Sequence, residues 1–166
     1  MLLFAEHGYD RTTTAQVARH AGLSEMTLFR HFASKEALLL EDPLDPVMAD
    51  EVRARPVSEN PMRAVAEGIR QAWSTMAASE VAHLRWLLGV VSDTPSLQGA
   101  LERSSGQTAS ALAAALEDRG VATCKARLAS AAVIAGLSRA LLDWSRDEEC
   151  DLDARVNLAL DILGGR

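Results

Sequence analysis

Apolar residues recur along most of the chain at steps of three and four, the spacing of a helix that buries one face. Short segments of this kind come first, over residues 1–7, 14–20, 25–31, 35–41 and 44–54. Longer segments follow, over residues 62–77, 80–92, 96–118, 123–147 and 152–163. Alternating runs of β-branched residues, which indicate strands, are nearly absent. The pattern therefore predicts an all-α fold.

The segments 14–20 and 25–31 are joined by a very short link that contains Gly22. Glycine permits a tight turn after the first segment. Thr13 and Ser24 precede the two segments, and both residue types are good helix caps because their side-chain oxygens accept from free backbone N–H groups. This arrangement predicts two helices that begin and end at defined residues.

The segment 25–31 has two distinct faces. Leu28 and Phe32 are four residues apart and therefore share one face, which Leu23 extends, and we expect this face to lie in the core. The other side is polar and is predicted to point outward, with Thr27, Arg30 and His31 on it and Phe29 at its flank. Such a helix pair is a helix-turn-helix.

The outward face suits B-DNA. A helix fits the major groove, where Arg30 can hold guanine O6 and N7 with a bidentate pair of hydrogen bonds. Thr27 can meet a thymine methyl or a phosphate, and His31 can add a phosphate contact. Thr13 and Lys35 lie at the starts of helices, where free N–H groups favour a phosphate.

Spacing alone leaves a second function open, because any short amphipathic helix pair has this form. A helical protein-interaction module can keep the helix-turn-helix shape without binding an operator. A face that grips phosphates should be sensitive to Arg30→Ala and to salt, whereas a protein-docking face should tolerate both.

The run from Phe4 to Leu39, FAEHGYDRTTTAQVARHAGLSEMTLFRHFASKEALL, resembles the DNA-binding domain of the TetR family of transcriptional regulators. The family pattern is F-A-x-x-G-aromatic, then T-T-x-x-(Ile/Val)-A-x-x-A-G-(Val/Leu)-S, then T-(Leu/Ile)-(Tyr/Phe)-x-(His/Tyr)-F, and last x-x-K-(Glu/Asp)-x-L-L. Each of these elements is present, so the resemblance is specific, although it covers only about the first quarter of the chain.

The resemblance implies a ligand-responsive homodimer, usually a repressor, that binds a palindromic operator in double-stranded DNA. Residues 1–41 would form the DNA-binding domain, and residues 42–166 a helical domain that dimerises and binds a small-molecule effector. Effector binding would change the spacing of the two DNA-reading heads. The family's DNA contacts fall on Thr13, Thr27, Phe29, Arg30, His31 and Lys35.

Two features depart from the family pattern. Glu25 occupies a position that is often basic or small, and its carboxylate would repel a nearby phosphate unless it points elsewhere. Family members also have a longer first helix after a basic arm, so we expect the first helix here to be incomplete and DNA binding to be weakened. A misassigned start, a shortened chain and unseen upstream residues all stay open as explanations.

Large apolar side chains in the second part of the chain predict a pocket for a mostly apolar effector, because flat rings leave gaps between helices. For any one tryptophan, ordinary core packing is at least as good an explanation. The predicted pocket residues are Trp73, Met76, His83, Trp86, Leu87 and Gln107.

The last two segments carry more apolar surface than one core contact would use. Pairing with a symmetry mate as a four-helix bundle would bury the surplus and match a palindromic operator, while packing within the chain is the alternative. The predicted interface residues are Leu128, Ala132, Ala135, Leu142, Val156, Leu160 and Leu163.

Charge and motifs narrow the function further. The net charge is -6, and the acidic excess lies after residue 40, whereas residues 1–40 are balanced. Glu80 and His83 form one Glu-x-x-His pair, but the second pair that a di-iron site needs is missing, and no nucleotide or hydrolase motif occurs. We expect no catalytic residue, metal or cofactor.

The apolar stretches fall well short of the roughly 20 residues of a membrane span, so we expect a cytoplasmic protein.

Overall fold

The computed structural model describes residues 2–40, 44–74 and 76–165, and within these ranges every regular element is helical. The prediction of an all-α fold is confirmed. The elements are α1 (Leu2–His7), α2 (Thr14–His20), α3 (Glu25–His31), α4 (Ala37–Leu40), α5 (Asp45–Ala54), α6 (Pro61–Trp73), α7 (Ala78–Asp93), the 3-10 turn η1 (Pro95–Leu97), α8 (Gln98–Asp118), α9 (Thr123–Ser145) and α10 (Leu152–Gly164).

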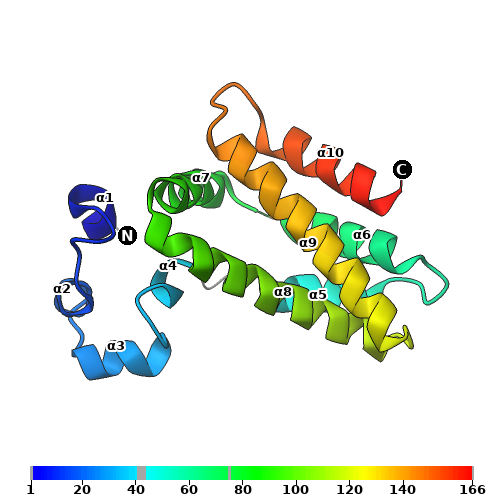
Figure 1. The fold of residues 1–166 in the computed structure, drawn as a ribbon, viewed down its shortest axis with the longest axis horizontal. Helices are drawn as coiled ribbons and strands as arrows, with labels where there is room; N and C mark the ends of the chain where they lie inside the picture. Colours follow the sequence, from blue (N-terminus) through cyan, green and yellow to red (C-terminus); the bar gives the residue numbers. More distant parts are fainter. Residues whose placement is uncertain (1, 41–43, 75, 166) are drawn as a thin grey trace.

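The helices fall into two groups. Figure 1 shows α1–α3, which we call the head, at one end of the molecule, and α5–α10, which we call the bundle, beside it. The short helix α4 lies between the two groups and continues toward the bundle. The domain boundary expected between residues 41 and 42 lies outside the described residues.

Most helix ends lie within a few residues of the predicted ones because local chemistry sets them. Gly22 (φ 69°) and Gly120 (φ 84°) take the left-handed conformation that ends a helix, which side chains other than glycine rarely adopt. The end of α6 differs most, at Trp73 rather than residue 77. The Ser74 hydroxyl donates to the carbonyl of Gln71 at 2.7 Å, and such a bond competes with continuation of the helix.

The bundle encloses one large apolar core. Trp144 is fully buried in it, and Arg85 lies over the indole, 4.1 Å from the ring centroid, while it donates to the carbonyls of Trp144 and Asp147. Helices α5, α6, α8, α9 and α10 supply the other fully buried large side chains, which include Val52, Ile69, Leu112, Val133 and Leu160.

Part of the predicted dimer face belongs to this core, which corrects the prediction. Val156 is 4% exposed and Leu160 is 0% exposed, because α10 turns these positions toward α6 and α9. Leu142 and Leu163 are half-buried and pack against the same core. The large apolar side chains that α9 and α10 leave exposed are Leu128, Leu158 and Ile162, and Ala132 and Ala135 of α9 are exposed as well.

A second, smaller core joins the head to the bundle. Phe4 and Tyr9 from the head pack with their ring centroids 5.5 Å apart, and both are buried. They share this cluster with Leu39 of α4 and with Val91, Leu97 and Ala100 of the bundle. We call these six residues the junction core. It contacts the head on one side and the bundle on the other, so the position of the head depends on it.

Helices α5 and α6 meet at Gly68, where an added Cβ would lie 2.6 Å from Val52 Cγ2 and 2.9 Å from Val52 N. Gly68→Ala should lower the free energy of unfolding by about 1–3 kcal/mol, because the two helices must move apart. Chemical denaturation measures this change.

The control is Gly106→Ala on the exposed side of α8, where an added Cβ would meet none of the described residues within 4 Å. It should raise the free energy of unfolding by roughly 0.5–1 kcal/mol through helix propensity. If both variants changed stability by the same amount, the close approach of α5 and α6 would be contradicted.

Candidate nucleic-acid interface and ligand cavity

The start of α2 is fixed by a reciprocal cap. The backbone N–H of Thr13 donates to Gln16 Oε1 at 2.7 Å, and the N–H of Gln16 donates to Thr13 Oγ1 at 3.2 Å. This capping box holds the exposed Thr13 at the helix N-terminus. The predicted cap is therefore present, and its free N–H groups lie where an anion is favoured.

The turn to α3 and the start of α3 are equally well defined. The N–H of Leu23 donates back to the Ala18 carbonyl at 2.8 Å across the turn at Gly22. Ser24 then caps α3, since its hydroxyl accepts from the N–H of Thr27 at 3.1 Å and lies 2.9 Å from the Thr27 hydroxyl. The two caps fix where the recognition surface of α3 begins.

The faces of α3 divide largely as predicted, with two corrections. Leu28 is buried at 3% exposure, but Phe32 is only half-buried, because the helix ends there in an extended conformation. Leu23 is 43% exposed rather than core, because the turn directs it outward.

The opposite side of α3 is open. Arg30 and His31 are exposed and Phe29 is 46% exposed, while Thr27 is half-buried against its cap. Sequence reasoning missed Met26, which is 85% exposed and stands four residues before Arg30 on the same side. The sequence did contain a signal for Met26, because it is an apolar residue at a position that belongs neither to the core face of the helix nor to its cap.

Lys35, which lies between α3 and α4, contacts Tyr9 of the head. Its ammonium donates to the Tyr9 carbonyl at 2.6 Å and lies 4.0 Å from the centroid of the Tyr9 ring. An ammonium has three donors, so two stay available for a phosphate. Burial, with the nearby Glu36 carboxylate as a second cause, raises the pKa of Tyr9 to about 12, so the phenol under Lys35 stays neutral.

Glu25, the residue at odds with DNA binding, has a partner within the head. The Thr14 hydroxyl of α2 donates to Glu25 Oε1 at 2.5 Å. This bond ties the starts of α2 and α3 and fixes the carboxylate on the α2 side of α3. A structural role in setting the angle between the two helices therefore accounts for an acidic residue at this position.

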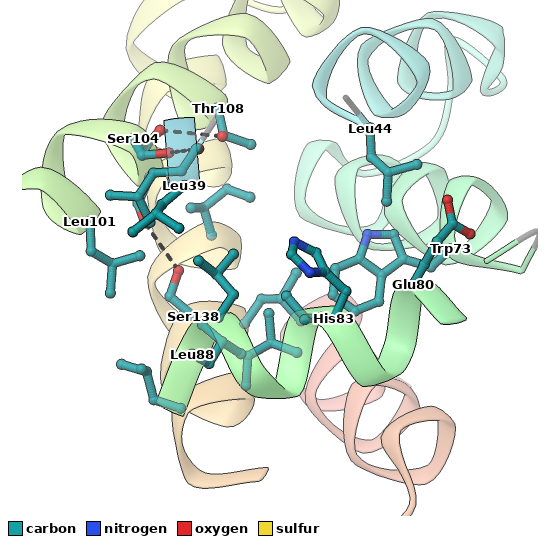
Figure 2. Close-up of a pocket in the computed structure, with 18 of the residues that line it drawn as sticks. Leu39, Leu44, Trp73, Glu80, His83, Leu88, Leu101, Ser104, Thr108 and Ser138 are labelled. Atoms are coloured by element: carbon teal, nitrogen blue, oxygen red, sulfur yellow. Dashed lines mark hydrogen bonds between the residues drawn. The ribbon is translucent and has the colours of Figure 1, made fainter. Parts of the chain in front are cut away.

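A cavity of about 500 Å³ lies beside α4, and α5 to α9 supply the rest of its wall. Trp73, Met76, His83 and Leu87 line it together, as Figure 2 shows for Trp73 and His83. Half of the described lining residues are leucines, and the volume is typical of sites for small molecules.

Two of the predicted pocket residues lie elsewhere. Trp86 packs against the junction core, with its ring 5.6 Å from that of His83. Gln107 is exposed on α8 and does not line the cavity, whereas the next residue, Thr108, does.

Leu38, Leu39 and Leu40 all line the cavity, and sequence reasoning assigned none of them to it. Leu39 also belongs to the junction core, so one side chain contacts both regions. The Ser104 hydroxyl of α8 donates to the Leu40 carbonyl at 2.9 Å, which holds α4 against the bundle. Three consecutive leucines on a helix cannot all face one core. The run could therefore have indicated that α4 contacts a second apolar region.

Within the described residues, no group of three or more His, Cys, Asp or Glu side chains is placed to hold a metal ion. None of the helices in these ranges is long and apolar enough to cross a membrane.

Known proteins resemble this chain in both of its parts. The family model "Bacterial regulatory proteins, tetR family" matches residues 1–41. The HTH-type transcriptional regulator TcmR of Streptomyces glaucescens is 37% identical over 70 residues, which cover 41% of this chain and 31% of TcmR. A protein of Mycobacterium tuberculosis described as a mycofactocin biosynthesis transcriptional regulator, MftR, is 28% identical over 98% of this chain and 84% of its own.

Among solved structures, the TetR family transcriptional regulator PfmR from Thermus thermophilus aligns with a TM-score of 0.44 and 21% identity. The alignment covers 98% of this chain and 92% of that one.

The capped helix-turn-helix with its open α3 face, together with these relatives, supports a DNA-binding transcriptional regulator. Residues 1–41 match the DNA-binding domain of the TetR family, and both relatives are transcriptional regulators, which supports a TetR family transcriptional regulator.

Because Glu25 accepts a hydrogen bond from Thr14, the effect of its charge on DNA binding can be tested separately from its structural role. Glu25→Gln keeps an oxygen that accepts from Thr14 but removes a negative charge from the DNA-facing end of the head. It should bind DNA of any sequence more tightly by about 1 kcal/mol, roughly fivefold, since one repulsion is lost. Fluorescence anisotropy at low salt measures this gain.

Glu25→Ala is the matched variant, because it removes the charge and the tie together. It should gain less affinity than Glu25→Gln and unfold at a lower temperature. Equal behaviour of the two variants would show that the tie does not position α3.

Proposed function

We propose that the protein is a cytoplasmic one-component repressor that leaves a palindromic operator when a small, mostly apolar effector binds. Residues 1–41 bind double-stranded DNA, and residues 42–166 dimerise and hold the effector. The observation that carries the proposal is the sharing of Leu39 between the junction core, which positions the head, and the wall of the cavity.

The exposed side of α3 supplies the DNA contacts. Arg30 reads guanine through its guanidinium fork, and Met26 contacts a thymine methyl, because an apolar side chain in the major groove can recognise that group. Thr13 presents N–H groups to one phosphate, and Lys35 turns its remaining donors to another. The remaining contacts to the backbone and groove edge come from Thr27, Phe29 and His31.

Dimerisation uses the apolar side chains that α9 and α10 leave exposed. The two helices pack side by side (Figure 1) and expose Leu128, Leu158 and Ile162 beside small alanines. Small residues let two helix pairs approach closely, so a second copy is the occupant that fits this surface. Two-fold symmetry of such a dimer matches a palindromic operator.

The effector acts through α4. A molecule in the cavity contacts Leu38, Leu39 and Leu40, and α4 can respond only by shifting against the bond between Ser104 and Leu40. A shift of α4 moves the junction core and with it the head. The two heads of a dimer must reach major grooves about 34–36 Å apart, so a changed separation releases the DNA. A bound dimer represses by occluding the promoter.

Arg30→Ala should weaken binding to a selected operator by about 1–3 kcal/mol and relax the preference at one base pair, because a bidentate contact to guanine is lost. Competition assays with operators changed at single positions measure both effects. Arg53→Ala is the control, since this exposed arginine lies on α5 and pairs with Asp50 and Asp118. If Arg30→Ala bound the operator as tightly as the control, Arg30 would not be the reading residue.

Ile162→Glu should convert the dimer to a monomer of 17.8 kDa, because it places a charge within an apolar contact. Val57→Glu is the matched control: Val57 is 76% exposed but lies outside α9 and α10. Sedimentation at micromolar concentration should give about twice the monomer mass for the wild type and the control. A monomeric wild type would overturn the proposed dimer, and a dimeric Ile162→Glu would overturn this interface.

A further inference from the structure

The polar groups that line the cavity beside α4 favour a positively charged ligand over a negatively charged one. Its described lining residues include one carboxylate, Glu80, and no lysine or arginine. The basic side chain among them is His83, which stands with Glu80 at the exposed edge of the cavity. A carboxylate ligand drawn into this cavity would therefore lose water without gaining a guanidinium or ammonium partner, and this costs free energy.

The hydroxyl groups on the opposite side mostly donate their protons within the protein. Ser104 donates to the Leu40 carbonyl at 2.9 Å, and Thr108 donates to the Asp45 carboxylate at 2.9 Å. A hydroxyl that has donated its one proton keeps only lone pairs, so both oxygens can accept from a ligand but cannot donate to it. Ser105 and Ser138, whose oxygens are 3.3 Å apart, keep one free donor between them.

The aromatic side chain in the wall adds to the same preference. Trp73 lies on the same side of the cavity as Glu80 and His83 (Figure 2). The indole N–H is shielded from solvent and has no hydrogen-bond partner among the described residues, so the cavity meets the ring rather than the N–H. The face of an indole ring attracts a cation, and the attraction grows when water is excluded.

We propose that the effector is an amphiphilic amine, with an apolar body among the leucines and an ammonium group held by Glu80 and the Trp73 ring. The proposal rests on the proposed effector site and specifies the chemical class of its ligand. An ammonium brings positive charge and hydrogen-bond donors, which match a wall that offers one carboxylate and several acceptor oxygens. An alcohol of the same length matches only the apolar part and some acceptors, and a carboxylate matches least.

The test uses three ligands that share a ten-carbon chain and differ only in the head group: decylamine, decanol and decanoate. Calorimetric titration of the whole chain at pH 7.5 gives a dissociation constant for each. Decylamine should bind about tenfold more tightly than decanol, and decanoate should bind more weakly than decanol. Decanoate binding as tightly as decylamine would overturn the proposal but leave the effector site standing.

Glu80→Gln locates the head group. Glutamine keeps an oxygen that can accept from the N–H of Ala77, as Glu80 Oε2 does at 2.6 Å, so the start of α7 is retained. The variant should bind decylamine about fivefold to tenfold more weakly and decanol unchanged. The control Glu102→Gln, on the exposed side of α8, should change neither.

Equal weakening of decylamine and decanol by Glu80→Gln would show that Glu80 shapes the cavity without holding a cation, which overturns the proposal. If none of the three ligands bound, the proposed effector site itself would be overturned. DNA binding by Arg30 is tested separately, so the two failures are distinguishable.

Discussion

The structure depends on Leu39, whose side chain packs into the junction core and also lines the cavity. Its side chain completes the junction core with Phe4 and Tyr9 and also forms part of the cavity wall. A packed core resists continuous deformation, so a change on one side of this side chain must be met on the other. The head is therefore positioned by the same short helix that a bound effector would touch.

Polar contacts reinforce this coupling at both ends of α4. Lys35 joins the start of that region to Tyr9, and Ser104 holds its end to α8 through the Leu40 carbonyl. The Ser96 hydroxyl of η1 adds a bond of 3.0 Å to Asp10 in the head. Each of these bonds contributes modestly, on the order of 1 kcal/mol. A ligand that fills the cavity can therefore break some of these bonds and replace them with contacts of its own.

Much of this arrangement could be predicted from the sequence. Helical spacing, Thr13, Ser24 and the glycines defined α2 and α3, because caps and turns are local. Positions that depend on how distant helices pack could not be assigned in this way. Val156 and Leu160 face the core while Leu158 and Ile162 stay exposed, and Trp86 packs at the junction rather than in the cavity. Glu25 needed the position of Thr14 across the turn to be explained.

The central claim is that this chain reads DNA as a two-fold symmetric dimer through α3. Selection of bound DNA from a random pool by the whole chain tests it most directly. The account predicts enrichment of a palindrome whose half-sites present major grooves about one helical turn, 34–36 Å, apart, with a guanine in each half-site for Arg30. Recovery of sequences that share no palindrome would contradict it.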